Sequence, residues 1–519
     1  MEREQGLQNP TFLFLLKQLS PMPEEVKPSL PESHPEKETP PISQDATDAQ
    51  KDQSITVVHP KWILYTSVLL GVTISMQYGW YTSQLNYAKF NNEKQCNARP
   101  VKEGTCIMFS GHSKAQWTVV VNAWVVGGML GALLVGKVSD RVGRNVPLCT
   151  TAALSYRCGD QAAVSDIWAF AFGRFLAGIA SGASTGCVGT YVNEIAPPHL
   201  RSKLGIGLQG GINLGIVLVD TTHFYLGFHD GWRIIAGFPI VLAGIFLVCG
   251  QFIMVESPVW LMLHGHRKEA EKVLVQLYGE ENVTTALSWI KPKKEPVDVE
   301  KQEPCWSEVG HETVIKGKGL TWAELFAVEM RRPLVVGMGL ACMQKLTGIN
   351  SIFYYSSSLF GGVGVADGRV CNIIVAIVNL VPTLCSGMVA ARFGNRPMIL
   401  FSTVGMCLSS IGITLSLAYD APKATVALAA AFVFSFAICL GPSCSVVSIG
   451  IFVAWAANLV VGIGYPYLAT ALETYKYVPF AVISGLSTIF VYYLVPETSN
   501  LTTVEIQEVF RKIRGNGRF

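Results

Sequence analysis

Long runs of apolar residues, separated by short polar turns, dominate the chain from residue 62 onward. A helix that crosses a bilayer needs about 20 residues of this kind. One further run, 146–156, is too short alone and is followed by Arg157 and Asp160. The pattern predicts a membrane protein of about twelve spans. The clear spans are 62–83, 116–136, 167–190, 204–225, 234–254, 333–360, 371–390, 397–418, 424–447, 450–471 and 477–495.

A long polar stretch, 259–332, divides the spans into two sets of six. It is highly charged, and part of it, "HGHRKEAEKVLVQLYGEEN", has a helical pattern. By the positive-inside rule such a segment lies on the cytosolic side. We therefore expect an N-terminal six-helix bundle at 61–258 and a C-terminal one at 333–498. Residues 1–60 and 499–519 are then cytosolic tails, and the polar, proline-rich first tail is expected to be disordered.

The two halves repeat short motifs in the same order. "SDRVGRN" (139–145) is echoed by "AARFGNR" (390–396), each after the second span of its half. "VESP" (255–258) is echoed by "VPETS" (495–499), each at the close of a set of six. Parallel repeats joined by a central linker are the plan of a major-facilitator transporter. The sequence therefore predicts an all-α membrane protein with this fold and both termini in the cytosol.

Composition agrees with a membrane protein, because 50% of the residues are hydrophobic and only 15% are charged. The net charge of +3 is too small to suggest a nucleic-acid partner. Most cysteines lie inside apolar runs, but Cys96 and Cys106 lie in a polar loop. In an extracellular loop these two can form a disulfide, and two free thiols fit the sequence equally well. No metal cluster, nucleophile or phosphate loop stands out, so we expect no cofactor, no metal and no enzyme activity.

Charged residues gather at the predicted cytosolic ends of the spans. Opposite charges there can pair while that side is closed and separate when it opens, which biases one of two states. For Arg144, a solvated charge that only anchors the helix end is an equal alternative. Arg174 lies within a span, which favours a gate. The expected cytosolic gate consists of Asp140, Arg141, Arg144, Arg174, Glu194, Arg201, Glu256, Arg392, Arg396 and Glu497.

Six motifs of the chain resemble, in order, the signature motifs of the sugar porters. They are "GKVSDRVGR", "GRFLAG", "YVNEIAPPHLRSKLG", "VESP", "QKLTGINSIFYY" and "VPETSNLT". The resemblance covers about residues 62–510 and is greatest to the facilitative hexose (GLUT-type) transporters. It implies transport of a hexose-like sugar across the plasma membrane by alternating access, with no chemical change to the sugar. A non-transporting sugar sensor, with a cytosolic protein bound to the N-terminal tail, is the rival interpretation.

The resemblance also implies which residues bind the sugar. Sugar hydroxyls donate and accept hydrogen bonds, so a site needs amides and aromatic faces. Tyr354 and Tyr355 resemble an extracellular lid. A single amide in a span can equally form a hydrogen bond between helices. The implied substrate-binding residues are Gln209, Ile216, Gln344, Lys345, Asn350, Asn379 and Trp455.

Two residues depart from the family pattern in ways that bear on the substrate. Lys345 stands where the family usually has a second glutamine, and an ammonium only donates hydrogen bonds. It can donate to the ligand from a watery cavity, favour an anionic ligand, or be paired; we favour the first. Tyr81 stands where proton-coupled relatives carry an aspartate, which favours facilitated diffusion. Asp220 and Lys345 keep proton symport as an alternative.

The second half is shorter than the first between equivalent motifs. Arg141 and Glu256 are 115 positions apart, whereas Arg392 and Glu497 are 105 apart. From Ala424 to Leu472 no residue is charged. Measured against the family, a block of residues is missing near Val447, and Ala391, Cys439 and Ala454 replace polar residues. We therefore expect an abnormal third span and an abnormal tenth and eleventh span region, which fits a divergent or spliced form and an incomplete gene model equally.

Overall fold

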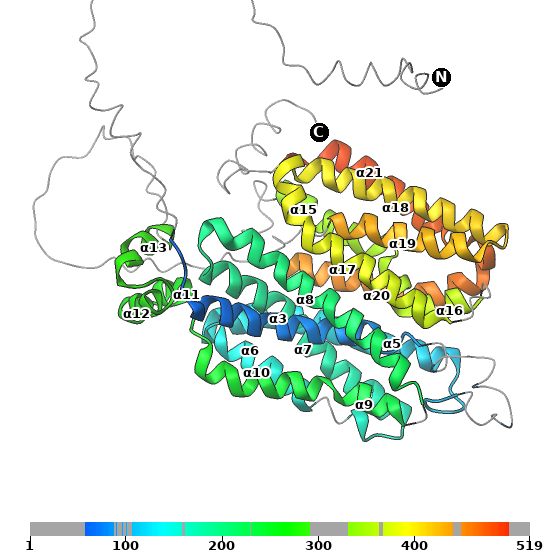
Figure 1. Cartoon of the computed structure of the whole chain (residues 1–519), viewed down its shortest axis with the longest axis horizontal. Helices are drawn as coiled ribbons and strands as arrows, with labels where there is room; N and C mark the ends of the chain where they lie inside the picture. The colour runs from blue at the N-terminus through cyan, green and yellow to red at the C-terminus, as the bar shows by residue number, and fades with distance from the viewer. Residues whose placement is uncertain are drawn as a thin grey trace, which may run out of the picture. The chain divides into compact units, whose positions relative to one another are not determined.

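The computed structural model describes residues 58–497, apart from short gaps and most of the expected linker. Contacts divide the chain into Met1–Val57 and Val58–Phe519, and every described residue belongs to the second unit. The expected tails therefore lie outside the described residues, except for 58–60. Within the described residues all regular structure is helical, which confirms the expected all-α fold (Figure 1). The gaps are 88–89, 91–95, 97–99, 101–105, 158–160, 229, 291–330, 363–366 and 440–447.

Helices cover all six predicted runs of the first half. The third run forms a helix of 13 residues. The sixth is split at Phe238, because Pro239 lacks an N–H and begins a new helix. These helices are α3 (Trp62–Ser83), α5 (Lys114–Val142), α6 (Asn145–Arg157), α7 (Ile167–Ile195), α8 (Pro198–Tyr225), α9 (Gly231–Gly237) and α10 (Pro239–Ile253).

Helices also cover the six predicted runs of the second half. The first run is broken between two helices at Gly348, whose φ of 91° is accessible to glycine without strain. The Cβ of any other residue there would lie 2.5 Å from the Phe480 ring. These helices are α15 (Arg331–Leu346), α16 (Ile349–Gly362), α17 (Gly368–Phe393), α18 (Asn395–Ala418), α19 (Pro422–Cys439), α20 (Ser448–Leu472) and α21 (Val478–Leu494).

Among the described residues, seven helices are long and apolar enough to cross a membrane by length and composition. Of the other spans, α3 has 22 residues but is not apolar enough to be counted, α6 and α21 are short, and the first span of the second half is divided into two helices. α6 and α19 are shorter than the first-half helices α5 and α7. The described residues thus account for each predicted run, although several runs are shorter as helices than the bilayer thickness requires.

The part of the linker that the structure describes folds into short helices against the first half. Tyr278 donates a hydrogen bond to the Ile195 carbonyl, and Leu274 and Leu277 are buried in one core with Leu64. We call this end of the bundle the linker end, and the opposite end, which carries Cys96 and Cys106, the cysteine end (Figure 1). The linker helices are α11 (Pro258–Leu263), α12 (Arg267–Tyr278), the 3₁₀ helix η2 (Glu280–Asn282) and α13 (Val283–Ile290).

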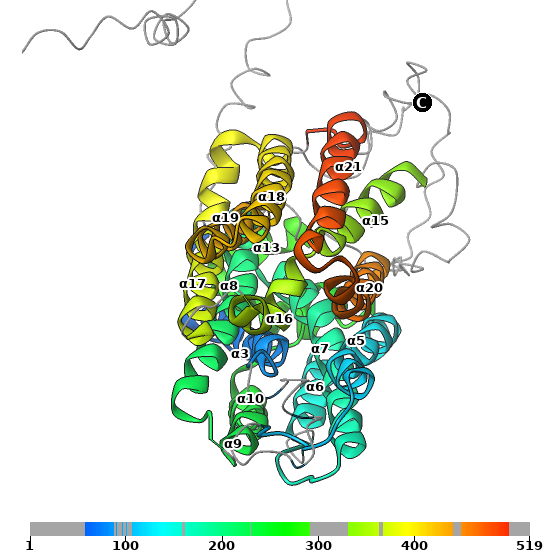
Figure 2. The ribbon, with the colours of Figure 1, turned by 90° about the vertical axis from the view of Figure 1, so that its right-hand side faces the viewer.

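Two helix pairs form most of the contact between the halves, α5 with α20 and α8 with α17. Figure 2 shows α17, α20 and α16 next to the first half, with α18 and α21 on the far side of the second half. Glycine residues let the helices of the two halves approach one another closely. A Cβ at Gly128 would lie 2.5 Å from the Trp455 ring, and one at Gly462 would lie 2.1 Å from Asn122 Oδ1. Close backbone approach at small residues is typical of helix packing in membranes.

Glycine spacing on α7 gives a direct test of this packing. A Cβ at Gly178 would lie 2.0 Å from the Trp124 carbonyl oxygen on α5, whereas one at Gly189 would meet nothing within 4 Å. Gly178→Ala should therefore lower the melting temperature of the purified protein by several degrees, since overpacking costs about 1–3 kcal/mol. Gly189→Ala, on the same helix, should leave it unchanged or raise it slightly. Equal melting temperatures for the two variants would show that the α5–α7 contact is looser than described.

Candidate functional site

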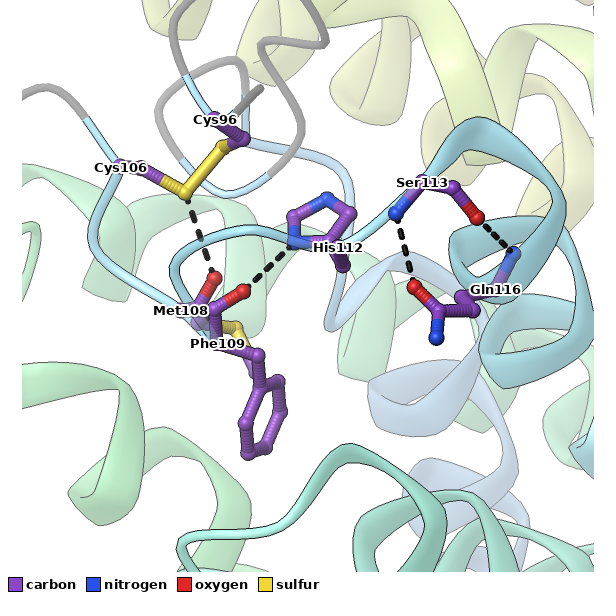
Figure 3. The surroundings of a disulfide bond; sticks show 7 residues. All are labelled: Cys96, Cys106, Met108, Phe109, His112, Ser113 and Gln116. Atoms are coloured by element: carbon purple, nitrogen blue, oxygen red, sulfur yellow. Dashed lines mark hydrogen bonds between the residues drawn. A yellow bond between two sulfur atoms is a disulfide. The ribbon is translucent and has the colours of Figure 1, made fainter. Parts of the chain in front are cut away.

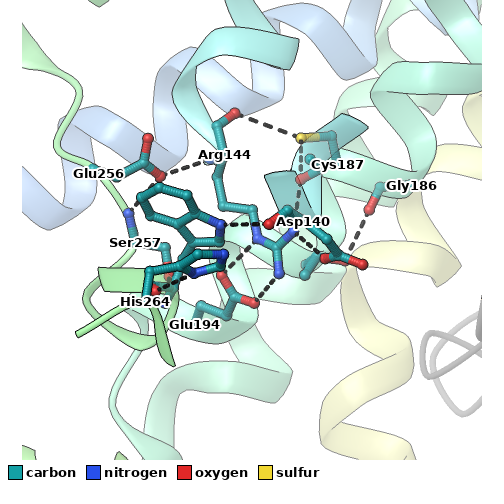
Figure 4. Close-up of polar contacts among 11 residues, drawn as sticks. Asp140, Arg144, Gly186, Cys187, Glu194, Glu256, Ser257 and His264 are labelled. Atoms are coloured by element: carbon teal, nitrogen blue, oxygen red, sulfur yellow. Dashed lines mark hydrogen bonds and ion pairs between the residues drawn. The ribbon is translucent and has the colours of Figure 1, made fainter. Parts of the chain in front are cut away.

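A buried arginine organises the linker end of the first half (Figure 4). The Arg144 guanidinium donates to Glu194 through Nε (3.0 Å) and Nη2 (2.9 Å). Its Nη1 donates to Asp140 Oδ1 at 2.9 Å. Burial lowers the pKa of Arg144, but hydrogen bonds and charges from Glu194 and Asp140 outweigh burial and hold its pKa above the ordinary value. A paired, permanently charged group therefore joins α5, α6 and α7.

Glu256 completes this cluster by capping a helix. Its Oε1 accepts from the Arg144 backbone N–H at 2.7 Å, and its Oε2 accepts from Asn145 at 3.2 Å. These N–H groups stand at the start of α6, where an anion satisfies free donors and the helix dipole. Gly143, with φ of 95°, makes the turn that exposes them. The "VESP" motif thus acts on the "VGRN" motif, 112 residues earlier in the chain.

The second half repeats the cap but not the charge cluster. Glu497 Oε1 accepts from the Asn395 backbone at 3.1 Å, and Oε2 from Arg396 at 3.1 Å, at the start of α18. Gly394, with φ of 88°, makes the equivalent turn. In the aligned motifs Asn395 takes the place of Arg144, and Ala391 takes that of Asp140. Glu497, one of the expected gate residues, accepts from the backbone N–H groups of Asn395 and Arg396 here.

The other expected gate residues are not all at the linker end. Arg141 and Arg392 are exposed there, and Arg201 Nε donates to the Ala196 carbonyl at 3.1 Å. Arg174 lies apart from these residues, away from the linker end. It lies on α7 about 30 Å from Glu194, at 1.5 Å per residue. The sequence shows that Arg174 lies within a span, but it does not show how deep in the membrane this residue lies.

Arg174 lies towards the cysteine end, buried beneath the last turn of α3. Its Nη1 donates to the Tyr81 carbonyl at 3.2 Å and to Gln84 Oε1 at 3.0 Å. The guanidinium also lies over the Trp124 ring, 5.8 Å from its centroid. It therefore joins α7 to α3 and α5 within the first half.

Near the middle of the bundle, amides from the two halves meet. Asn213 Nδ2 on α8 donates to the Asn379 carbonyl at 3.2 Å and to Thr383 Oγ1 at 2.9 Å, both on α17. Gln209 Nε2 donates to Asn213 Oδ1 at 3.2 Å. Asn379 Oδ1 is buried and accepts no hydrogen bond from the described residues. Gln209 and Asn379 are thus brought close together, and Ile216 is buried two turns beyond Gln209 on α8.

Asn213 was missed by the sequence reasoning. It stands one turn after Gln209 in "LQGGIN", so the two amides share a helix face, and this spacing was the available signal. The resemblance drew attention to Gln209 instead. Asn213 is the residue that reaches the other half, and it is 1% exposed.

A second polar group lies between α16 and α20. Asn350 Nδ2 donates to Asn458 Oδ1 at 2.5 Å, and Asn458 Nδ2 donates to the Tyr354 hydroxyl at 2.8 Å. The Tyr355 hydroxyl donates to the Gly462 carbonyl at 3.2 Å. Both expected lid tyrosines are therefore tied to α20.

Trp455 on α20 continues this surface into the first half. Its ring centroid lies 4.9 Å from that of Trp124 and 5.5 Å from that of Tyr78. Both contacts are edge-on, an arrangement that aromatic quadrupoles favour. Amides and aromatic faces from both halves therefore meet in the middle of the bundle.

Gln344 and Lys345, although adjacent in sequence, lie on different sides of α15. Gln344 lines a cavity of about 30 Å³ within the second half, together with Met343, Thr403 and Phe436. Gln344 is therefore separate from the amide group of Gln209 and Asn379. Lys345 is partly buried.

Hydrogen bonds join the halves at the cysteine end. Asn86 Nδ2 donates to Ser356 Oγ at 2.8 Å, which donates to Asn372 Oδ1 at 2.8 Å. Asn372 Nδ2 donates back to the Asn86 carbonyl at 3.2 Å. Nearby, Arg369 Nη1 donates to the His223 carbonyl at 3.5 Å. The hydrogen bonds described between the halves thus hold the cysteine end and the middle of the bundle.

The loop at this end contains a disulfide between Cys96 and Cys106, with Cα atoms 5.1 Å apart (Figure 3). His112 lies beside it and contacts the Phe109 carbonyl through Nδ1 at 2.9 Å. Ser113 and Gln116 then form a capping box that begins α5. The cross-link and the cap together fix where the loop enters the second span.

Comparison with known proteins gives consistent matches along most of the chain. The family model described as "Sugar (and other) transporter" matches residues 55–510. The human solute carrier family 2, facilitated glucose transporter member 4 is 28% identical over 479 residues, covering 86% of this chain and 91% of the relative. Member 1 of the same family from chicken is 30% identical over 424 residues, covering 76% and 83%.

Solved structures match at the level of the fold. A partially occluded inward-open structure of the xylose transporter XylE from E. coli has a TM-score of 0.68 and 21% identity, covering 85% of this chain and 100% of that one. The same protein bound to 6-bromo-6-deoxy-D-glucose has a TM-score of 0.69 and 21% identity, covering 86% and 98%. These matches confirm the major-facilitator fold.

The linker-end cluster predicts an unequal effect of two neighbouring arginines. Arg144→Ala leaves Glu194 partly buried without its partner, and breaking such a pair costs about 3 kcal/mol or more. The melting temperature in detergent should fall by several degrees. Arg141→Ala, which removes an exposed guanidinium from the same turn, should change it by less than about 1 °C. Similar losses in both variants would mean that net charge, and not the described pairing, stabilises this end.

Proposed function

Because this chain belongs to the sugar (and other) transporter family, we propose that it carries hexose-like sugars through the membrane by facilitated diffusion. Alternating access of the two halves around a central site would move the sugar downhill in either direction. No chemical change to the sugar is part of this proposal.

The observation that carries the proposal is a buried polar contact between the halves. Asn213 on α8 binds α17 beside Asn379, whose side-chain oxygen accepts nothing from the described residues. A buried acceptor without a partner is costly, and a sugar hydroxyl would satisfy it. With Trp455 as an aromatic face, this supports a sugar site between the halves. Besides Asn213, the proposed contacts are Gln209, Ile216, Lys345, Asn350, Asn379 and Trp455, with Tyr354 and Tyr355 as the lid. Gln344, which lines the cavity within the second half, is not among them.

We assign the cysteine end to the outside, because disulfides persist in oxidising compartments. The linker end is then cytosolic, and so are both termini, with the plasma membrane as the proposed location. The bonds among Asn86, Ser356 and Asn372 support a state closed to the outside. The cluster around Arg144 lies within one half, so we propose that it holds the cytosolic ends of α5, α6 and α7 together while the halves move.

One observation favours proton symport as a second candidate. Asp220 is 2% exposed and accepts a hydrogen bond from Ser83 Oγ at 2.6 Å, with His223 Nδ1 at 3.8 Å. A buried carboxylate in a span is a group that can bind and release a proton. Against it, Tyr81 supplies no carboxylate beside Arg174, and its carbonyl is what Arg174 contacts.

A sugar sensor remains the rival from another class. The second half lacks the charge cluster of the first, since Asn395 replaces Arg144 in the aligned motifs. In this alternative the N-terminal tail, which lies outside the described residues, would bind a cytosolic protein. Binding of sugar without flux would support it.

Uptake into proteoliposomes tests these alternatives. Labelled glucose, fructose and xylose should equilibrate at a rate that a pH gradient does not change. Accumulation above equilibrium driven by the gradient would favour symport, and binding without uptake would favour the sensor.

Asn379→Ala tests the proposed site. It should raise the KM for the transported sugar about fivefold, because one hydrogen bond contributes about 1 kcal/mol. Asn282→Ala, which removes an amide in η2 far from the bundle centre, serves as the matched control. An unchanged KM for Asn379→Ala, with normal folding, would contradict the site.

A further inference from the structure

The neighbours of Lys345 on α15 show which side of the helix this residue occupies. Leu340, Met343 and Thr347 line the small cavity within the second half, and a Cβ at Gly339 would lie 2.4 Å from the Phe490 ring on α21. Successive residues of a helix turn by about 100°, so Lys345 projects from nearly the opposite side.

That opposite side is turned away from α18 and α21. The cavity is closed by α18 and α21, which lie on the far side of the second half in Figure 2. Lys345 also stands just before the break at Gly348, close in sequence to Asn350 and its contact with α20. Its partly buried ammonium therefore points away from the outer helices, one turn before the break that divides the seventh span.

This ammonium has no partner among the residues that the structure describes. No hydrogen bond or ion pair reaches its Nζ within them, although the side chain is partly buried. An unpaired ammonium at membrane depth is unfavourable, and such residues mark ligand pathways.

No carboxylate of the second half is placed to pair with it. Between residues 333 and 495 the sequence holds three acids, Asp367, Asp420 and Glu473. Asp367 caps the start of α17, Asp420 follows α18, and Glu473 follows α20, so all three lie at helix ends. The segments 363–366 and 440–447 contain no acid.

The carboxylates of the first-half spans are already engaged. Asp140 and Glu194 accept from Arg144 at the linker end. Asp220 accepts from Ser83 and lies near His223. The positive charge of Lys345 is therefore uncompensated by the described protein, in a region lined by amides.

We propose that the solute carried through this site is an acidic sugar, a hexose-sized ring bearing one carboxylate, which Lys345 binds through its ammonium. This inference rests on the proposed transport function and narrows its substrate class to hexuronates. A carboxylate supplies the charge-assisted partner that a neutral hexose cannot, while the amides bind the ring hydroxyls.

Transport of a monoanion also moves charge. At equilibrium its accumulation ratio depends on membrane potential, by about fiftyfold per 100 mV. The accumulation of a neutral hexose does not depend on potential, so voltage distinguishes the two substrate classes independently of any substitution.

The test uses the full chain in proteoliposomes, with initial uptake of labelled glucuronate and glucose at one pH and an imposed potassium-diffusion potential. The wild type should take up glucuronate at least about tenfold faster than glucose, and an inside-positive potential should increase its accumulation. Lys345→Gln should lower the glucuronate-to-glucose ratio about tenfold or more, since a charged hydrogen bond contributes this much selectivity. Lys345→Arg should keep the preference, and Lys423→Gln, an exposed lysine at the start of α19, should leave it unchanged.

Each other result overturns the inference. Faster glucose than glucuronate uptake by the wild type rejects the acidic substrate while the proposed transport function stands. Glucuronate preference that survives Lys345→Gln rejects the role of Lys345. If Lys345→Gln does not fold, Lys345→Met replaces it, and the wild-type ratio with its voltage response still decides the substrate class. Uptake of neither solute, nor of any neutral hexose, instead refutes the transport function itself.

Discussion

A hydrocarbon environment supplies no hydrogen bonds, so backbone groups at membrane depth must find their partners within the protein. This constraint accounts for the all-helical fold and for what happens where helices end or break. At the linker end, Glu256 and Glu497 bind the free N–H groups that begin α6 and α18. Buried Arg174 donates through Nη1 to the Tyr81 carbonyl and to the Gln84 side chain at the end of α3, while its Nε has no partner among the described residues. Because lipid offers no hydrogen-bond partners, polar side chains gather inside the protein and apolar side chains cover its outer surface.

The two halves share a construction but not a charge distribution. Each uses a glycine turn and a carboxylate cap at the same place, Gly143 with Glu256 and Gly394 with Glu497. Only the first half adds the guanidinium of Arg144. The linker end of the first half is thus cross-linked by charged side chains, whereas at the equivalent end Arg396 donates to the Tyr492 carbonyl and lies over the Tyr492 ring.

Much of the fold could be predicted because an apolar run of about 20 residues rarely forms anything other than a membrane-spanning helix. The breaks at Pro239 and Gly348 were harder, since a run of apolar residues looks continuous whether or not its helix is. The site was predicted only in part. Asn379 and Gln209 do lie together, but the side chain that reaches across to α17 there is Asn213. Arg174 lies far along α7 from the other expected gate residues. Helical periodicity shows which residues share a face of a helix. It does not show how deep in the membrane a residue lies or which residue it contacts on another helix.

The glycine that divides α15 from α16 gives the seventh span two unequal parts. The first part, α15, packs beside α18 and α21. The second part, α16, carries Asn350, Tyr354 and Ser356 and contacts α3, α17 and α20. The break at Gly348 lets α16 tilt while α15 stays in place. Opening toward the cysteine end can then begin as a local movement of α16, which breaks the hydrogen bonds of Ser356, before either six-helix body has to turn.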